Sequence, residues 1–405
     1  MPRVIVIGAG AAGTMAAIFA ATRGAETLLL ERTKDGGRKV LISGGGRCNI
    51  LPARLDESRF VTDSSPHTLR KMLRSWPLHE QIAFFERDAC IPLVEEPETA
   101  KLFPVSQRAR DVRDRLLALA RARGVTLRMN TLVTRFAPSG SGWRVERQGE
   151  PSLESDAVIV ATGGLSVPNT GSDGGGLRNA EQLGHVVRPT YAALTPLTAT
   201  PSPFAHLAGV SLPVTLTATS VGTRATAAGG FLFTHGGYSG PAVLDISHLA
   251  VRSRGTPSPA RIVARWTRFG DDEWKEALRP RGTRTVLSGV SAELPDRLAV
   301  ALVQRAGVDP RQTLSTLRRN DRQRLIDLLV RAELPWTGDE GYKKAEVTGG
   351  GVSLADIDPG TMESRRHKGL FLCGEMLDAF GPIGGYNFYW AWATGRAAGV
   401  GAATG

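Results

Sequence analysis

The stretch VIVIGAGAAG at residues 4–13 decides the fold of the N-terminal region. Val4 to Ile7 are four consecutive β-branched residues, a pattern typical of a strand buried in a parallel sheet. Three glycines follow, and the alanine-rich stretch 14–23 has the composition of a helix. A second apolar strand, Thr27 to Leu30, ends at Glu31. This order predicts a strand–helix–strand unit of about 30 residues.

The three glycines of this stretch have separate roles in such a unit. Gly8 permits the tight turn, Gly10 lets the backbone approach a pyrophosphate, and Gly13 lets the helix pack closely on the strand. The helix N-terminus presents free N–H groups and a positive dipole end to the phosphates. Glu31 stands eighteen residues after Gly13, where a carboxylate accepts hydrogen bonds from an adenosine ribose. The sequence therefore predicts a dinucleotide site.

Later segments favour FAD over NAD(P) as the resident dinucleotide. AVIVATGG at 157–164 is a hydrophobic strand of the kind that returns beside FAD in flavoproteins with this fold. The loop 36–49 combines consecutive glycines with Arg38, Lys39 and Arg47, which suits a path along the pyrophosphate toward the flavin. A helix from about Asn387 is expected to direct its N-terminus at the flavin ring, where it stabilises negative charge.

The composition and periodicity of the sequence change twice along the chain. Residues 190–270 alternate Thr, Val, Pro and Gly and predict a β-rich module, and residues 271–335 return to helical patterns. We therefore expect an α/β fold with a glutathione-reductase-type FAD-binding Rossmann domain, formed by residues 1–189 and 347–405. The insert, residues 190–346, is expected to be a substrate or cap domain.

Composition limits the classes of partner. The net charge is +11, and 42 of the 50 basic residues are arginine. No basic stretch is interleaved with aromatic residues and no metal-ligating pattern is present, so we expect a small-molecule substrate and no metal, and nucleic acid is the less favoured partner. No apolar run is long enough to cross a membrane. The three cysteines form no CxxC pair, which favours a reducing compartment, and we expect a cytoplasmic protein.

Seven motifs together resemble the BaiN-like, or aminoacetone-oxidase-like, family of bacterial FAD-dependent flavoproteins. They run from end to end of the chain, and the second and the last are the most specific. They are GAGAAG at 8–13, GRKVLISGGGRCN at 37–49, KLFPVSQRARDV at 101–112, ATGGLSVPNTGSDG at 161–174, LFTHGGYSGPAVLDIS at 232–247, VTGGGVSLADIDPGTMESR at 347–365 and GLFLCGEMLDAFGPIGGYNFYWAWATGRAAG at 369–399.

The resemblance implies a set of FAD contacts. These are Gly8, Gly10, Ala12, Gly13, Glu31, Arg38, Lys39, Gly46, Arg47, Asn49, Val133, Thr162, Gly163, Gly374, Glu375, Gly385, Tyr386 and Asn387. The chain departs from the family at 174–176, where three glycines replace a turn that carries an acidic residue. Residues 271–332 match nothing sharply, so the substrate of known members does not carry over.

The chemistry is expected to be redox exchange between the flavin and a small molecule. With one glycine fingerprint, NAD(P)H can serve only as a transient co-substrate. Two enzyme hypotheses stay open: NAD(P)H-linked reduction of an unsaturated carbonyl or steroid-like compound, and O₂-dependent oxidation of a small amine. An RNA-associated or regulatory flavoprotein is the alternative of another class. His235 and Tyr238 are candidate catalytic residues, as proton donors or acceptors near the flavin.

Overall fold

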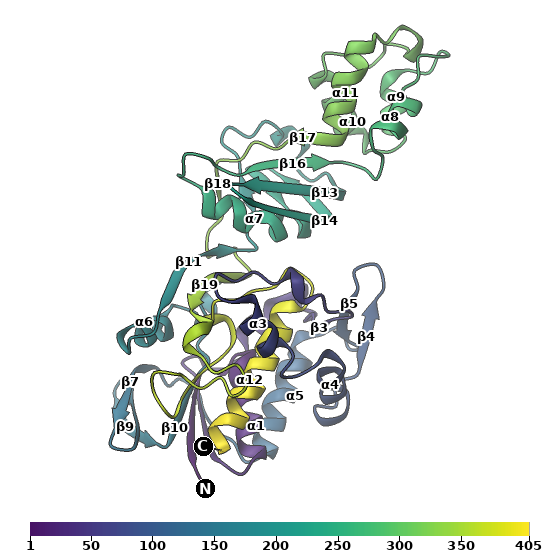
Figure 1. The fold of residues 1–405 in the computed structure, drawn as a ribbon. Helices are drawn as coiled ribbons and strands as arrows, with labels where there is room; N and C mark the ends of the chain where they lie inside the picture. Colours follow the sequence, from purple (N-terminus) through teal and green to yellow (C-terminus); the bar gives the residue numbers. More distant parts are fainter. Residues whose placement is uncertain (405) are drawn as a thin grey trace. The chain divides into compact units, whose positions relative to one another are not determined.

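The computed structural model describes residues 1–404 (Figure 1). Its internal contacts divide the chain into two compact units. The first unit consists of Met1–Ala192 and Glu346–Gly405, and the second is Ala193–Ala345. The sequence patterns placed these boundaries at 189/190 and 346/347. Each unit has a hydrophobic core of its own, so each is described separately.

A five-stranded parallel sheet forms the centre of the first unit. Its order is β20–β10–β1–β2–β6, and β1 pairs in parallel with both β10 and β2. The three central strands are buried along almost their whole length, which explains their unbroken apolar sequences. The bounds are Arg3–Ile7 for β1, Glu26–Leu30 for β2, Thr126–Arg128 for β6, Ala157–Val160 for β10 and Leu370–Leu372 for β20. The predicted Rossmann-type sheet is confirmed.

Two helices from opposite ends of the chain pack closely in this unit. They are α1 (Ala11–Thr22) and α12 (Tyr386–Thr404). A Cβ atom on Gly395 would lie 2.3 Å from the Ala12 carbonyl oxygen, and one on Gly399 would lie 2.2 Å from that of Ala16. The two glycines of α12, one turn apart, therefore allow the backbones of the helices to touch.

The remaining elements of the first unit are short. Two three-stranded sheets, β3–β5–β4 and β7–β8–β9, and the pair β11–β19 accompany the central sheet. Their strands are β3 (Leu51–Pro52), β4 (Leu93–Glu96), β5 (Lys101–Pro104), β7 (Val133–Ser139), β8 (Gly142–Arg147), β9 (Glu150–Ser155), β11 (Val187–Ala193) and β19 (Val347–Val352). The helices are α2 (Arg38–Ile42), α3 (Pro66–Leu73), α4 (Leu78–Ala83), α5 (Ala109–Ala122) and α6 (Gly175–Gln182).

Three segments differ from the sequence expectation. The loop expected at 36–49 contains the short helix α2, which lies between Gly37 and Ser43 and holds no glycine or proline. The sequence pattern of residues 66–88 predicts one helix, but the helix is interrupted before Pro77, which becomes the N-cap of α4. The extended pattern of residues 126–136 predicts one strand, but the structure divides it between β6, in the parallel sheet, and β7, which pairs with β8.

The second unit is built on a seven-stranded antiparallel sheet of its own. The order is β17–β16–β13–β14–β15–β12–β18, and none of its strands pairs with the parallel sheet. The strands are β12 (Leu197–Thr198), β13 (Ser211–Ser220), β14 (Thr223–Thr234), β15 (Gly237–Ser239), β16 (Arg261–Arg265), β17 (Ala332–Glu333) and β18 (Gly338–Asp339). The helix α7 (Pro241–Ser253) buries Ala242, Val243 and Ile246 in the same core.

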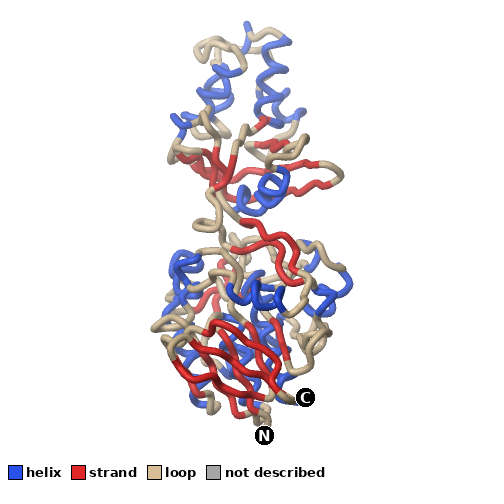
Figure 2. Tube along the Cα trace, turned by 90° about the vertical axis from the view of Figure 1, so that its left-hand side faces the viewer, coloured by secondary structure: helices blue, strands red, loops and turns tan. Residues whose placement is uncertain are grey.

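Four further helices form the helical part of the second unit. Figure 2 shows them, in blue, gathered on one side of the red strands. They are α8 (Asp271–Ala277), α9 (Val286–Ser291), α10 (Asp296–Arg305) and α11 (Arg319–Arg331). Trp274, Leu298, Leu302 and Leu325 are fully buried in this part, as their spacing suggests. Within residues 1–404, no helix has both the length and the apolar character needed to span a membrane.

Candidate flavin site

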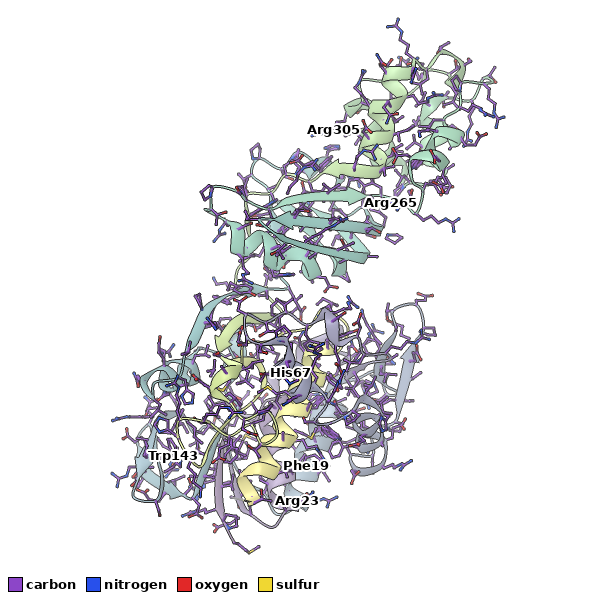
Figure 3. The ribbon with its side chains drawn as sticks, in the orientation of Figure 1. Phe19, Arg23, His67, Trp143, Arg265 and Arg305 are labelled. Atoms are coloured by element: carbon purple, nitrogen blue, oxygen red, sulfur yellow. The ribbon has the colours of Figure 1, made fainter. Side chains whose placement is uncertain are left out.

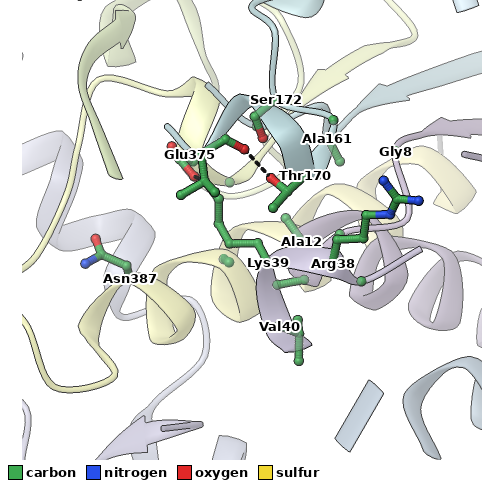
Figure 4. A pocket seen from close by; sticks show the side chains of 18 of the residues that line it. Gly8, Ala12, Arg38, Lys39, Val40, Ala161, Thr170, Ser172, Glu375 and Asn387 are labelled. Atoms are coloured by element: carbon green, nitrogen blue, oxygen red, sulfur yellow. Dashed lines mark hydrogen bonds and ion pairs between the residues drawn. The ribbon is translucent and has the colours of Figure 1, made fainter. Parts of the chain in front are cut away.

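A large cavity opens at the carboxyl ends of the central parallel strands (Figure 4). Its volume is about 480 Å³, within the range of small-molecule and cofactor sites. Ile7 at the end of β1, Leu30 at the end of β2 and Ala161 just after β10 line it, and all of its lining residues belong to the first unit. The fold therefore gathers segments that are far apart in the sequence around one space.

Fifteen of the eighteen residues expected to contact FAD line this cavity. They are Gly8, Gly10, Ala12, Glu31, Arg38, Lys39, Arg47, Asn49, Val133, Thr162, Gly163, Gly374, Glu375, Gly385 and Asn387. The other three do not. A Cβ on Gly13 would lie 1.8 Å from the Gly8 carbonyl oxygen, so Gly13 serves helix packing. The Tyr386 hydroxyl donates to the Arg54 carbonyl (3.3 Å), and Gly46 is exposed.

Gly10 provides a test of whether a pyrophosphate fits. Its φ of −79° suits any residue, and a Cβ there would meet no atom within 4 Å. The helix α1 that follows has no side-chain cap and no acidic residue in its first turn. The space beside Gly10 is thus open and bordered by uncapped N–H groups of the helix. Any side chain in place of the glycine hydrogen would occupy this space. These features suit a bound phosphate.

Glu31 organises the turn from the end of β2. One carboxylate oxygen accepts a hydrogen bond from the backbone N–H of Ala9 (2.7 Å). The other accepts from the backbone N–H and the hydroxyl of Thr33, at 2.8 and 2.7 Å. The buried carboxylate therefore holds the glycine turn against the next loop while it lines the cavity.

Glu375 joins four segments at the opposite wall. One of its carboxylate oxygens pairs with the Lys39 ammonium of α2 at 2.5 Å. The other accepts from the Ser166 hydroxyl, which follows β10, and from the Thr348 backbone N–H and hydroxyl on β19, both at 3.0 Å. The charge of Glu375 is thus compensated within the protein, and Lys39 is positioned by it (Figure 4).

Two asparagines shape the entry to α12. Asn387 accepts from the Gly381 N–H and donates to the Gly381 carbonyl, both at 2.9 Å. The Asn49 amide, assigned to suit its neighbours, accepts from the Gly385 N–H at 2.9 Å and donates to the Leu51 carbonyl at 3.1 Å. These bonds place the N-terminus of α12 beside the loop 43–49.

Charge pairing separates the cavity's ionisable groups into two kinds. Four cations have carboxylate partners: Arg32 with Asp173, Arg38 with Asp35, Lys39 with Glu375 and Arg47 with Glu96. Lys101 and Glu346 also line the cavity, and the side chain of neither forms a hydrogen bond or ion pair with any described residue.

Sequence reasoning missed Lys101 and Glu346. Lys101 lies in the motif KLFPVSQRARDV, where alternation places it on the same strand face as Phe103. Glu346 directly precedes the glycine-rich strand β19. Glu346 is exposed, but the protein atoms around its carboxyl group partly desolvate it and so raise its pKa. The charge of Lys39 opposes this rise, and that of Glu375 adds to it.

The two candidate catalytic residues lie in the second unit. His235 is exposed at the turn between β14 and β15. Tyr238 is 1% exposed, packs against Phe231 and Phe233, and has a hydroxyl without a hydrogen-bond partner. Burial raises the pKa of Tyr238 further above its usual value. Tyr238 is thus part of the hydrophobic core of the second unit, and the catalytic roles of His235 and Tyr238 stay predictions.

A parallel sheet of the Rossmann type, with a glycine-lined cavity at the carboxyl ends of its strands, is the arrangement of an FAD-dependent oxidoreductase. Comparison with known families agrees: the profile of the HI0933-like protein Rossmann domain matches residues 2–401. The chain belongs to this family. The resemblance inferred from its motifs is therefore confirmed, and so is the expectation that it is a flavoenzyme.

Similar proteins span nearly the whole chain. The ribosomal RNA dihydrouridine synthase of Escherichia coli K12 is 33% identical over 397 residues, which cover 96% of this chain and 95% of that protein. The 3-dehydro-bile acid delta(4,6)-reductase of Clostridium scindens is 31% identical over 415 residues, with 100% and 99% coverage.

Among solved structures, a 3-ketosteroid-delta4-(5alpha)-dehydrogenase from Rhodococcus jostii RHA1 matches with a TM-score of 0.50 at 16% identity. The alignment covers 100% of this chain and 97% of that protein. At this identity the likeness supports the fold alone.

Proposed function

We propose that this enzyme uses FAD to reduce a carbon–carbon double bond conjugated to a carbonyl group, with NAD(P)H as the source of the hydride. The observation that carries the proposal is the chemistry shared by its relatives. Dihydrouridine is uridine whose C5–C6 double bond, conjugated to the C4 carbonyl, has been saturated. The delta(4,6) bonds of a 3-dehydro-bile acid are conjugated to the 3-oxo group in the same way. Both products require two hydrogens across a polarised alkene.

The balance of the reaction is simple. A hydride adds to the alkene carbon remote from the carbonyl, a proton adds to the neighbouring carbon, and NAD(P)H becomes NAD(P)⁺. Bound FAD supplies the hydride transfer chemistry. The protein's part is to hold the dinucleotide through the Gly8–Gly13 turn and α1, and to keep Lys39 fixed through Glu375.

The cysteines support direct exchange between the flavin and a diffusible hydride donor. Burial raises the pKa of Cys48 to about 12, and burial also raises that of Cys373, so both remain protonated thiols. Cys90 is exposed, and the three cysteines are free. A dithiol relay of the disulfide-reductase kind is thus not supported.

Charge in the second unit favours uridine in RNA as the substrate. Residues 193–345 carry 20 Lys and Arg against 13 Asp and Glu, whereas the other 252 residues carry 30 against 26. The excess positive charge is therefore concentrated in the insert. The sequence analysis gave nucleic acid little support because no basic stretch is interleaved with aromatic residues, whereas this uneven distribution of charge between the two units supports an RNA substrate.

The arginines at the start of α11 add to this argument. The side chains of Arg318, Arg319 and Arg322 form no hydrogen bond or ion pair with any described residue. They stand at the positive end of a helix and one turn or less from one another, where cations are destabilising by about 0.3–1 kcal/mol each. A polyanion such as RNA would relieve this repulsion.

The test uses purified holoenzyme with ribosomal RNA transcribed without modifications. NADH or NADPH is added, and nucleosides are analysed by mass spectrometry for a gain of two hydrogens in uridine. A steroid 4,6-dien-3-one replaces RNA in a second arm, and a small primary amine with O₂ in a third. The proposal expects nicotinamide-dependent saturation in the first arm.

The steroid and amine arms show which other function the protein has if uridine in RNA is not reduced. Saturation of the steroid alone would keep the reductase chemistry and remove RNA as the substrate. Peroxide formation with the amine, and no saturation in either other arm, would make the protein an oxidase and overturn the proposal.

A further inference from the structure

Lys101 is the one lysine or arginine lining the flavin cavity that has no carboxylate within ion-pair distance among the described residues. The carboxylate of Glu96 interacts electrostatically with Lys101 over a longer distance. It forms its ion pair with Arg47, at 3.0 Å, and accepts a hydrogen bond from the Thr99 hydroxyl at 2.5 Å. A positive charge is thus left unbalanced in a partly buried site.

The strand β5 directs this charge into the cavity. Lys101 and Phe103 alternate with Leu102, and both line the cavity while Leu102 is buried. Arg47 covers the Phe103 ring at 4.1 Å, so the aromatic side chain is held in place. The Lys101 Cε lies 3.8 Å from where a Cβ on Gly384 would stand, beside the N-terminus of α12.

This end of the cavity is the one left for the flavin ring. The pyrophosphate is expected at Gly10, and the adenosine at Glu31, whose carbonyl accepts from the Thr131 N–H at 2.8 Å just before Val133. A dinucleotide that runs from Glu31 past Gly10 continues toward Lys39, Asn49 and Gly385. Lys101 and the N-terminus of α12 meet there, so a side-chain cation and a helix dipole converge on the same space.

We propose that Lys101 stabilises the negative charge that reduction places on the flavin, and so sets the reduction potential of the bound FAD. The inference depends on FAD binding and not on the identity of the substrate. The oxidised ring is neutral, so Lys101 should favour the reduced cofactor over the oxidised one. Its role is electrostatic tuning, with no proton transferred from its ammonium group.

The experiment measures the midpoint potential of the holoenzyme by anaerobic equilibration with a reference dye. Lys101→Met removes the charge, Lys101→Gln removes it with a polar side chain, and Lys101→Arg keeps it. Lys71→Met, on the exposed side of α3, removes one cation away from the cavity and is the matched control. Both neutral variants should lose the preference for reduced FAD by about tenfold, a fall of about 30 mV, and the other two should match the wild type.

Two results would overturn the proposal. Unchanged potentials in both neutral variants would show that Lys101 does not act on the flavin charge. Titration of the apoprotein measures its affinity for oxidised and for reduced FAD. If a neutral variant lost the same affinity for both forms, Lys101 would act on the phosphates or on folding instead. Weaker binding confined to reduced FAD would support it.

Discussion

Gly10 and Gly13 lie one helical turn apart and meet different surroundings. A side chain at Gly10 would enter the cavity, and one at Gly13 would enter the backbone of Gly8. We expect Gly10→Val to fold with nearly wild-type thermal stability and to purify without flavin. Gly13→Val should lose about 3 kcal/mol or more of unfolding free energy, because the helix must leave the turn.

Absorbance at the flavin band and thermal unfolding of the apoprotein separate these effects. Stoichiometric flavin in Gly10→Val would contradict the placement of the pyrophosphate. A stable Gly13→Val would contradict the close packing of α1 on the turn.

Glu346 provides a pH-dependent prediction. Its pKa is raised in the folded apoprotein, so the folded state holds the proton more tightly than the unfolded state. This interaction therefore weakens folding as pH rises above the ordinary glutamate range. Glu346→Gln cannot ionise, and its advantage in melting temperature over the wild type should grow from about pH 4 to about pH 8. Glu340→Gln, an exposed neighbour, is the control. A constant difference across this range would refute the assignment.

Pairing of charges is the part of the site that sequence could not supply. The glycine turn, Glu31 and the ends of the strands were predictable because their spacing is local. Whether Arg47 meets Glu96, 49 residues away, or Lys101 meets no partner depends on how β4 and β5 pack beside the cavity. The sequence alone therefore grouped Arg38, Lys39 and Arg47 as phosphate ligands, although the protein itself compensates each of them.

At the scale of elements, the sequence predicts secondary structure where the residues that specify it are consecutive. The unit β1–α1–β2 is such a case, and it is present as expected. The division of residues 126–136 between two sheets could not be predicted, because an extended pattern does not tell which sheet its residues join. Tyr238 illustrates the same limit, because its motif gave no sign that the side chain faces a hydrophobic core.

The proposed RNA substrate makes a prediction about the helix α11. Replacing Arg318, Arg319 and Arg322 by glutamine should weaken RNA binding and lower the slope of log affinity against log salt by about two to three, at somewhat under one per phosphate contact. It should also stabilise the free protein slightly, since three cations leave a helix N-terminus. Fluorescence titration with labelled ribosomal RNA at several salt concentrations measures the slope.

The matched control replaces Arg110, Arg115 and Arg121 on α5 of the first unit, whose side chains likewise form no ion pair with any described residue. Equal losses in both triple variants would reduce the effect to net charge. Arg305, labelled in Figure 3, belongs to the same helical part but contacts the Phe204 ring at 5.5 Å, so it is left unchanged.

At the scale of the whole molecule, the residues expected to hold the cofactor and the insert belong to different units of the chain. Every residue that lines the cavity belongs to the first unit, and β11 and β19, which flank the insert in sequence, pair with each other. We expect a chain in which a short Gly-Ser linker replaces residues 193–345 to retain FAD and to lose salt-dependent retention on RNA. Heating it should release FAD and no FMN. Loss of FAD from a folded, shortened chain would show that the insert contributes to cofactor binding.

The central claim is that reduced flavin in this protein saturates a conjugated double bond. The most direct measurement is a single turnover under argon, with the flavin reduced beforehand and unmodified ribosomal RNA added without nicotinamide. We predict that the flavin absorbance returns and that one uridine gains two hydrogens for each flavin reoxidised. A flavin that stays reduced with both the RNA and a steroid 4,6-dien-3-one, and reoxidises only when O₂ is admitted, would contradict the account.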